Sequence, residues 1–141
     1  KIMVDSDGRL PASAQILKEG KVLVITANDI TVAEPAECLV LPSVDQNIDL
    51  NALMAVLAQR EINELMIEAG GVLNGALLKA GLIDELVIYM APKIMGDMAR
   101  GVFHLPEMMT MSQNISLTID DIRAVGKDWR ITARPIYNEE S

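Results

Sequence analysis

The residues best suited to bind a ligand lie together in the stretch MIEAGGVLNGALLKAGLIDELVIYMAPK, residues 66–93. An apolar run ends at Glu68, and two adjacent glycines, Gly70 and Gly71, precede a helix-like segment. In an open α/β sheet, ligands bind beyond the carboxyl ends of the strands, where the next helix offers unpaired N–H groups and a positive dipole end. Because glycine lets the backbone approach a bound group closely, this pattern predicts a phosphate site.

The glycine pair also fits a plain tight turn that binds nothing. It is neither a Walker loop, since no Gly-Lys-Ser/Thr follows, nor the Gly-x-Gly-x-x-Gly of common dinucleotide folds. No acidic residue lies between Gly70 and Ile83, so the start of the helix carries no charge that would repel an anion. Gly75, one turn in, allows close packing of the helix on the sheet or on a ligand. The local pattern is consistent with a phosphate and names no cofactor.

Glu68 places a carboxylate at the end of the apolar run. Such a group is either exposed at the edge of a sheet or buried with partners. In the functional interpretation it accepts hydrogen bonds from sugar hydroxyls or a ring N–H, and its closeness to the expected phosphate site favours that role. His104, the one histidine, stands in GVFHLP and is interpreted as structural or surface. No residue stands out as a general acid, so the catalytic residue stays unknown.

The elements that must position these residues follow from the apolar runs. The runs alternate with helix-like segments, which predicts one α/β domain with a parallel sheet and right-handed crossovers. Asp49 is the expected N-cap of a helix, Gly81 the stop of the next helix, and Gly126 the turn of a hairpin. The expected strands are 1–4, 21–26, 38–41, 65–68 and 85–90, the helices are 49–61 and 72–79, and the antiparallel hairpin is 115–122 with 129–133.

Composition limits the classes of partner. The chain has 141 residues, half of them hydrophobic, which suits one domain with a real core. Its formal net charge of −8 argues against nucleic acid as a partner. The single cysteine indicates neither a disulfide nor a metal site, and a reducing, cytoplasmic setting fits it. No uncharged apolar run approaches the ~18 residues of a membrane-spanning helix.

Three stretches carry a resemblance to a known family: VDSDGRLP, MIEAGGVLNGALLKAGLIDELVIYMAPKIMGDMARGVF and IRAVGKDWRITARP. Together they resemble the reductase (C-terminal) domain of the bacterial bifunctional riboflavin biosynthesis deaminase–reductase. The resemblance implies a dihydrofolate-reductase-like α/β fold. Such a fold has a mixed, mostly parallel sheet flanked by helices, with a C-terminal antiparallel hairpin.

The resemblance also implies an activity and a set of site residues. The activity is NADPH-dependent reduction of 5-amino-6-(5-phosphoribosylamino)uracil to the 5-phosphoribitylamino product. The ribose ring opens and a hydride reduces C1′. Glu68 is implied to bind the substrate, no metal is implied, and the protein is expected to be a homodimer. The residues implied to bind NADPH are Ser6, Gly70, Gly71, Val72, Leu73, Asn74, Gly75 and Ala76.

The resemblance covers the C-terminal part of that reductase domain. We therefore expect the N-terminal part, with a Thr/Asp-containing cofactor loop and an Arg for the substrate phosphate, and the zinc-binding deaminase domain to be absent from residues 1–141. Two alternatives stay open. One is a reductase on the same scaffold that acts on a pterin or dihydrofolate, and the other is a nucleotide-binding or assembly module without catalysis.

Overall fold

The structure is a computed structural model that describes residues 1–18, 20–30, 32, 34–45, 47–96, 98–106 and 108–137. The chain divides into two compact units, Lys1–Leu65 and Met66–Ser141, and each is described by itself. Within the described residues, no helix is both long and apolar enough to cross a membrane.

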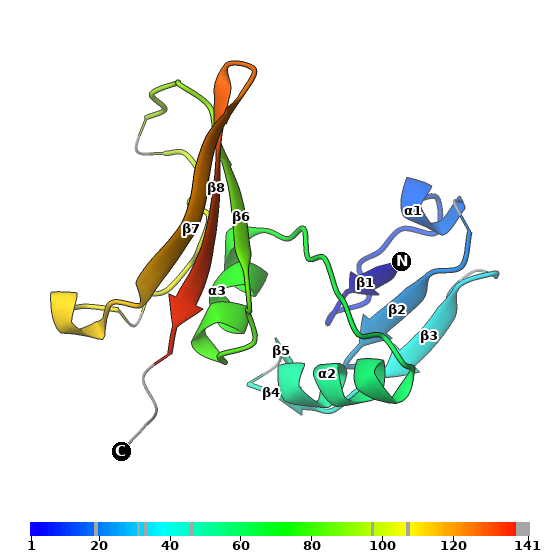
Figure 1. Ribbon diagram of the computed structural model, residues 1–141. Coiled ribbons are helices and arrows are strands. Elements are labelled where there is room, and N and C mark those ends of the chain that lie inside the picture. The colour runs from blue at the N-terminus through cyan, green and yellow to red at the C-terminus, as the bar shows by residue number, and fades with distance from the viewer. Residues whose placement is uncertain are drawn as a thin grey trace. The chain divides into compact units, whose positions relative to one another are not determined.

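The first unit is built on a parallel sheet of three strands, β1 (Ile2–Val4), β2 (Leu23–Thr26) and β3 (Glu37–Val40), in the order β1-β2-β3 (Figure 1). All four residues of the central strand β2 are buried. The apolar run KVLVIT predicts this burial, because a parallel strand covered on both faces has no polar side. The strands expected at 1–4, 21–26 and 38–41 are confirmed, with ends shifted by one or two residues.

Helices cover both faces of this sheet, since successive β2 side chains point to opposite sides. Leu23 and Ile25 belong to a core with Leu53 and Leu57 of α2 (Leu50–Gln59). Val22 and Val24 pack instead with Leu17 of the short helix α1 (Gln15–Lys18). Two short antiparallel strands, β4 (Ser43–Val44) and β5 (Asn47–Ile48), lead into α2.

The ends of α2 follow from local chemistry. Asp49 is the N-cap, and its carboxylate accepts hydrogen bonds from the backbone N–H groups of Asn51 at 2.9 Å and Ala52 at 3.1 Å. At the other end, the Glu61 N–H donates to Ala58 O and the Ile62 N–H to Leu57 O. This bond pattern requires a left-handed residue just past the helix, and Glu61 has a φ of 60° there. The predicted helix and its cap are confirmed.

The strand expected at 65–68 is wrong. No strand occurs between α2 and α3, and no described strand pairs with this segment. Its apolar side chains are open to solvent, with Met66 85% exposed. An apolar run becomes a strand only where a neighbouring backbone completes the hydrogen-bonded ladder, and none of the described strands does so here. Glu68 therefore lies in irregular chain, two residues before Gly70.

The second unit combines helix α3 (Gly71–Lys79) with an antiparallel sheet of β6 (Leu86–Met90), β7 (Ser116–Val125) and β8 (Asp128–Ile136). The strand order is β6-β8-β7 (Figure 1). The hairpin β7–β8 is confirmed and turns at Gly126, which has a φ of 63°. β6, which the sequence places in the parallel sheet, pairs instead antiparallel with β8. An apolar run does not encode the direction of its neighbour.

Helix α3 ends as the sequence predicts. The Gly81 N–H donates to Leu78 O, the Leu82 N–H to Leu77 O, and Gly81 has a φ of 69°. Such a left-handed glycine closes the last turn without side-chain strain. The described residues between 94 and 114 are mostly loop, apart from the short helix η1 (Met111–Gln113).

Candidate functional site

The start of α3 offers backbone donors that no side chain satisfies. Gly70 is the N-cap, with an extended backbone (φ −79°, ψ 166°), and no side chain caps the first turn. The first helical bond runs from the Asn74 N–H to Gly70 O, at 3.1 Å. Free N–H groups and the positive dipole end at such a turn favour an anion. The helix has no acidic residue in its first turn.

The three glycines around this turn meet different surroundings. A Cβ on Gly75 would lie 2.2 Å from His104 O, and a Cβ on Gly71 would lie 2.8 Å from Gly101 O. A Cβ on Gly70 would meet nothing within 4 Å. Gly75 therefore does allow close packing, but its partner is the 101–104 loop rather than the sheet or a ligand. Packing therefore does not explain why residue 70, Gly70, is a glycine.

Hydrogen bonds fasten the 101–104 loop to the same turn. The His104 N–H donates to Gly71 O at 2.8 Å. The Asn74 side-chain amide donates to Ala69 O and Val102 O, each at 3.1 Å. Sequence reasoning missed this link, although a lone amide between apolar residues of the helix was a signal for it. The His104 side chain is exposed and its backbone is bonded, which confirms its interpretation as structural or surface.

Glu68 precedes this turn and is exposed. Among the described residues its carboxylate has no hydrogen-bond or ion-pair partner, so its oxygens are open to a ligand. Of the remaining expected cofactor residues, Val72 and Ala76 are exposed, Leu73 is half-buried and Gly75 is buried. Glu68 and the start of α3 thus lie close together because they are neighbours in the chain. The 101–104 loop covers one side of the helix start.

Ser6 belongs to the first unit, where it follows β1. Its carbonyl accepts from Asn28 Nδ2 at 3.1 Å and from the Ala27 N–H at 3.4 Å. No hydrogen bond of its hydroxyl occurs among the described residues. The Asn28 N–H also donates to the buried Thr26 Oγ1, at 3.1 Å. Sequence reasoning missed Asn28, which joins the carboxyl ends of β1 and β2, the edge where parallel sheets bind ligands.

Residues 1–131 match the RibD C-terminal domain, which is more than nine-tenths of the chain. The chain belongs to the RibD C-terminal domain family. This confirms the riboflavin-pathway resemblance.

Two relatives illustrate the RibD relationship. The chain is 35% identical over 138 residues to the 5-amino-6-(5-phosphoribosylamino)uracil reductase of Buchnera aphidicola subsp. Acyrthosiphon pisum, covering 96% of this chain and 67% of that protein. It is 34% identical over 131 residues to the riboflavin biosynthesis protein RibD of Escherichia coli, covering 91% of this chain and 36% of that protein. The chain therefore spans about a third of the length of such RibD relatives.

Solved structures share the fold. Acinetobacter baumannii RibD, form 2, superposes with a TM-score of 0.80 at 28% identity, and the match covers 96% of this chain and 37% of that one. The mixed α/β fold is thus that of RibD reductase domains, which confirms the dihydrofolate-reductase-like class.

Other parts of the described chain add no competing centre. No group of three or more described His, Cys, Asp or Glu residues could hold a metal ion.

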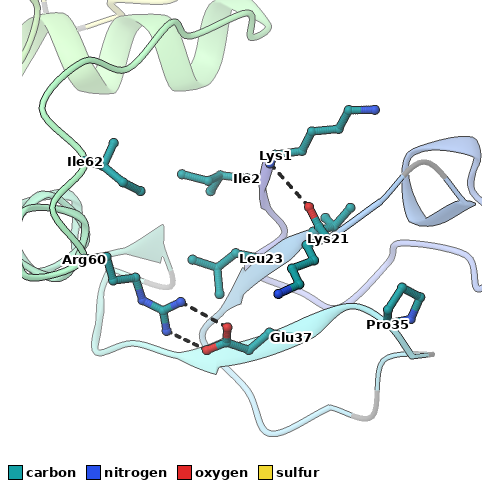
Figure 2. A pocket seen from close by; sticks show the side chains of 9 residues that line it. Lys1, Ile2, Lys21, Leu23, Pro35, Glu37, Arg60 and Ile62 are labelled. Atoms are coloured by element: carbon teal, nitrogen blue, oxygen red, sulfur yellow. Dashed lines mark hydrogen bonds and ion pairs between the residues drawn. The ribbon is translucent and has the colours of Figure 1, made fainter.

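A cavity of about 420 Å³ lies in the first unit at the amino ends of its parallel strands (Figure 2). Arg60 and Glu37 form a two-pronged ion pair on its wall, at 2.6 and 3.1 Å. That hydrogen-bonded guanidinium lowers the pKa of the Glu37 carboxyl. The cavity lies at the end of the sheet opposite Ser6.

Proposed function

We propose that this chain forms part of the site that reduces 5-amino-6-(5-phosphoribosylamino)uracil to its 5-phosphoribitylamino product, with NADPH, in riboflavin biosynthesis. The observation that carries the proposal is the 35% identity, over nearly the whole chain, to a protein named for that reductase activity. The uncapped start of α3, next to the open Gly70, agrees with it.

The cofactor proposal rests on the chemistry of the first turn of α3. A dinucleotide carries a diphosphate bridge, which is an anion with hydrogen-bond acceptors only. The free N–H groups of the turn and its dipole complement that anion, and the missing side chain at Gly70 leaves room for close approach. Ser6 stays a proposed NADPH-contacting residue, as the family resemblance implies, and its hydroxyl makes no hydrogen bond among the described residues.

The substrate proposal rests on Glu68. Its exposed carboxylate can accept hydrogen bonds from the ribose hydroxyls and hold the sugar in a reactive position. In the reaction the ribose ring opens to a C1′=N double bond, a hydride adds at C1′ and a proton at the nitrogen. When bound, NADPH would supply the hydride, which is chemistry of the cofactor rather than of the protein.

Three finer expectations belong to the same proposal. NADPH is the proposed nicotinamide cofactor, the proposed assembly is a homodimer and the proposed location is the cytoplasm. The single Cys38 suits a reducing compartment.

The proposal is tested with the full-length protein that carries these residues. We expect NADPH oxidation that depends on the phosphoribosylaminouracil, with the ribitylamino product identified by mass spectrometry. NADH should support much slower turnover. Oxidation with dihydrofolate but not with the aminouracil would replace the proposal by the pterin alternative. NADPH binding without turnover of either substrate would favour the non-catalytic module.

A further inference from the structure

The Asn74 side chain has no donor left for a ligand. A carboxamide carries two N–H hydrogens, and those of Asn74 go to Ala69 O and Val102 O, each at 3.1 Å. Only its oxygen remains, and an oxygen acceptor does not bind a diphosphate, which itself only accepts. The family resemblance lists Asn74 among the cofactor-binding residues, but its side chain cannot act by donating to the diphosphate.

The 101–104 loop occupies one face of the first turn of α3. Gly71, Asn74 and Gly75 are spaced i, i+3, i+4, so they share this face. The loop backbone is so close to the two glycines that neither could carry a Cβ without displacement. Phe103, beside these contacts, lines a second cavity together with Leu78 of α3 and Leu86 of β6. A ligand must therefore reach the helix start from the Gly70 side.

The bond to Ala69 has a further consequence at Gly70. The peptide unit between the two residues is planar, and in its trans form the C=O and N–H point in opposite directions. Holding the Ala69 carbonyl against Asn74 therefore directs the Gly70 N–H away from Asn74 and from the docked loop. A Cβ placed on Gly70 would meet nothing within 4 Å, so the position of its missing side chain is also open.

We propose that Asn74 is a positioning residue that sets the affinity for NADPH. It orients the Gly70 N–H and docks the 101–104 loop on α3, and its side chain does not touch the diphosphate. This inference rests on the proposed function, because it assumes that the dinucleotide binds at the start of α3.

The test compares Asn74→Ala and Asn74→Asp with wild type in the full-length protein. Asp keeps the size of Asn but offers no N–H when ionised. Both variants should raise the Kd for NADPH at least about tenfold, because the oriented N–H binds a charged group. Turnover at saturating NADPH and the KM for the aminouracil should stay within about twofold. Asn51→Ala, on the exposed start of α2, is the matched control and should leave the Kd unchanged.

A second variant reaches the same loop from another residue. Gly75→Ala forces the loop away from α3 while leaving the amide of Asn74 in place. It should also raise the Kd for NADPH. The Kd of the Asn74→Ala, Gly75→Ala double variant should be close to that of the single variant with the higher Kd, because both substitutions act through one docked loop. Should Asn74→Ala not fold, Asn74→Ser, which keeps one donor, takes its place with a smaller expected loss.

Limited digestion with trypsin reports loop docking without NADPH. Arg100 is exposed at the start of the loop, so undocking in Asn74→Ala should speed cleavage after it. Unchanged cleavage together with a Kd within twofold of wild type would overturn the inference. Wild-type protein that binds no NADPH would overturn the proposed function and the affinity role together, whereas faster cleavage would still show that Asn74 docks the loop.

Discussion

At the scale of single residues, the glycines at the start of α3 divide into two kinds. Gly71 and Gly75 face the backbone of the 101–104 loop, and a methyl group on either would collide with a carbonyl oxygen. Gly70 has ordinary backbone angles and open space around its Cα. The two adjacent glycines therefore differ. Gly71 lacks a side chain because the loop packs against it, whereas at Gly70 the open space is available to a ligand.

This division predicts the effect of Gly70→Ala. The variant should fold with a free energy of unfolding within about 1 kcal/mol of wild type, the usual size of an N-cap change. The new methyl group would obstruct the diphosphate that is proposed to bind there, so the Kd for NADPH should rise roughly tenfold or more, the worth of one charged hydrogen bond. Titration of NADPH by fluorescence checks it. Gly96→Ala, also in open space, is the matched control, and equal affinities for both variants would contradict the assignment.

Glu68→Gln tests the substrate role. The amide keeps the shape of the side chain and loses the charge that strengthens hydrogen bonds from sugar hydroxyls. We expect the KM for the aminouracil to rise about tenfold, with little change in the Kd for NADPH. Steady-state kinetics with each substrate varied in turn measures both. Glu64→Gln, an exposed acid in the same segment, should behave as wild type. An unchanged KM and an unchanged turnover number would remove Glu68 from the site.

At the scale of elements, both helices that could be read from the sequence end in the same kind of turn. α3 closes with Gly81 in the left-handed conformation, where glycine is unstrained. α2 closes with the same bond pattern around Glu61, whose Cβ makes that conformation costly. The difference shows that the last turn of α2 keeps its geometry through its hydrogen bonds and its packing, in spite of the residue type.

Glu61→Gly should therefore stabilise the protein. Removing the Cβ relieves the left-handed backbone, and the expected gain in the free energy of unfolding is about 1 kcal/mol. Urea unfolding followed by circular dichroism measures it. Glu64→Gly provides the comparison, because Glu64 has no left-handed backbone and glycine there adds only chain entropy to the unfolded state. A loss of stability in Glu61→Gly would show that the side chain of Glu61 contributes more than its strain costs.

At the scale of the whole molecule, each unit has an exposed ion pair that links two of its secondary-structure elements. Arg60 at the end of α2 binds Glu37 of β3, and Arg134 of β8 binds Asp120 of β7 at 2.8 and 2.9 Å. In each pair the side-chain hydrogen bonds from the arginine lower the pKa of the carboxyl, from 4.5 for Glu37 and from 3.8 for Asp120. Solvent screens both pairs, so each contributes modestly.

The sign of the pH effect follows from these lowered pKa values. A carboxyl with a lowered pKa in the folded state stabilises the protein above its unfolded pKa, and that stability is lost as pH falls through the folded pKa. Stability should therefore be flat near neutral pH and fall below about pH 4.5. Glu37→Gln with Asp120→Asn should make the fall shallower, as measured by urea midpoints along a pH series. Asp29→Asn, which removes an exposed acid outside both pairs, is the control variant.

The sequence by itself determined the features that depend on neighbours along the chain. The Asp49 cap, the stop at Gly81, the turn at Gly126 and the buried run of β2 all follow from local hydrogen bonds, backbone angles or an unbroken apolar pattern. The candidate phosphate turn before α3 was visible for the same reason. The family was recognisable because its motifs are themselves local strings of residues.

Only the tertiary structure decided which distant segments meet. The apolar run at 65–68 pairs with no described strand, β6 lies antiparallel to β8, and Gly75 faces His104. Each of these three observations depends on whether a segment many residues away lies beside the element. The residue types of the element do not indicate which distant segment that is. Loop docking through Asn74 belongs to the same class, since an amide shows its two donors in sequence but not the carbonyls that accept from them.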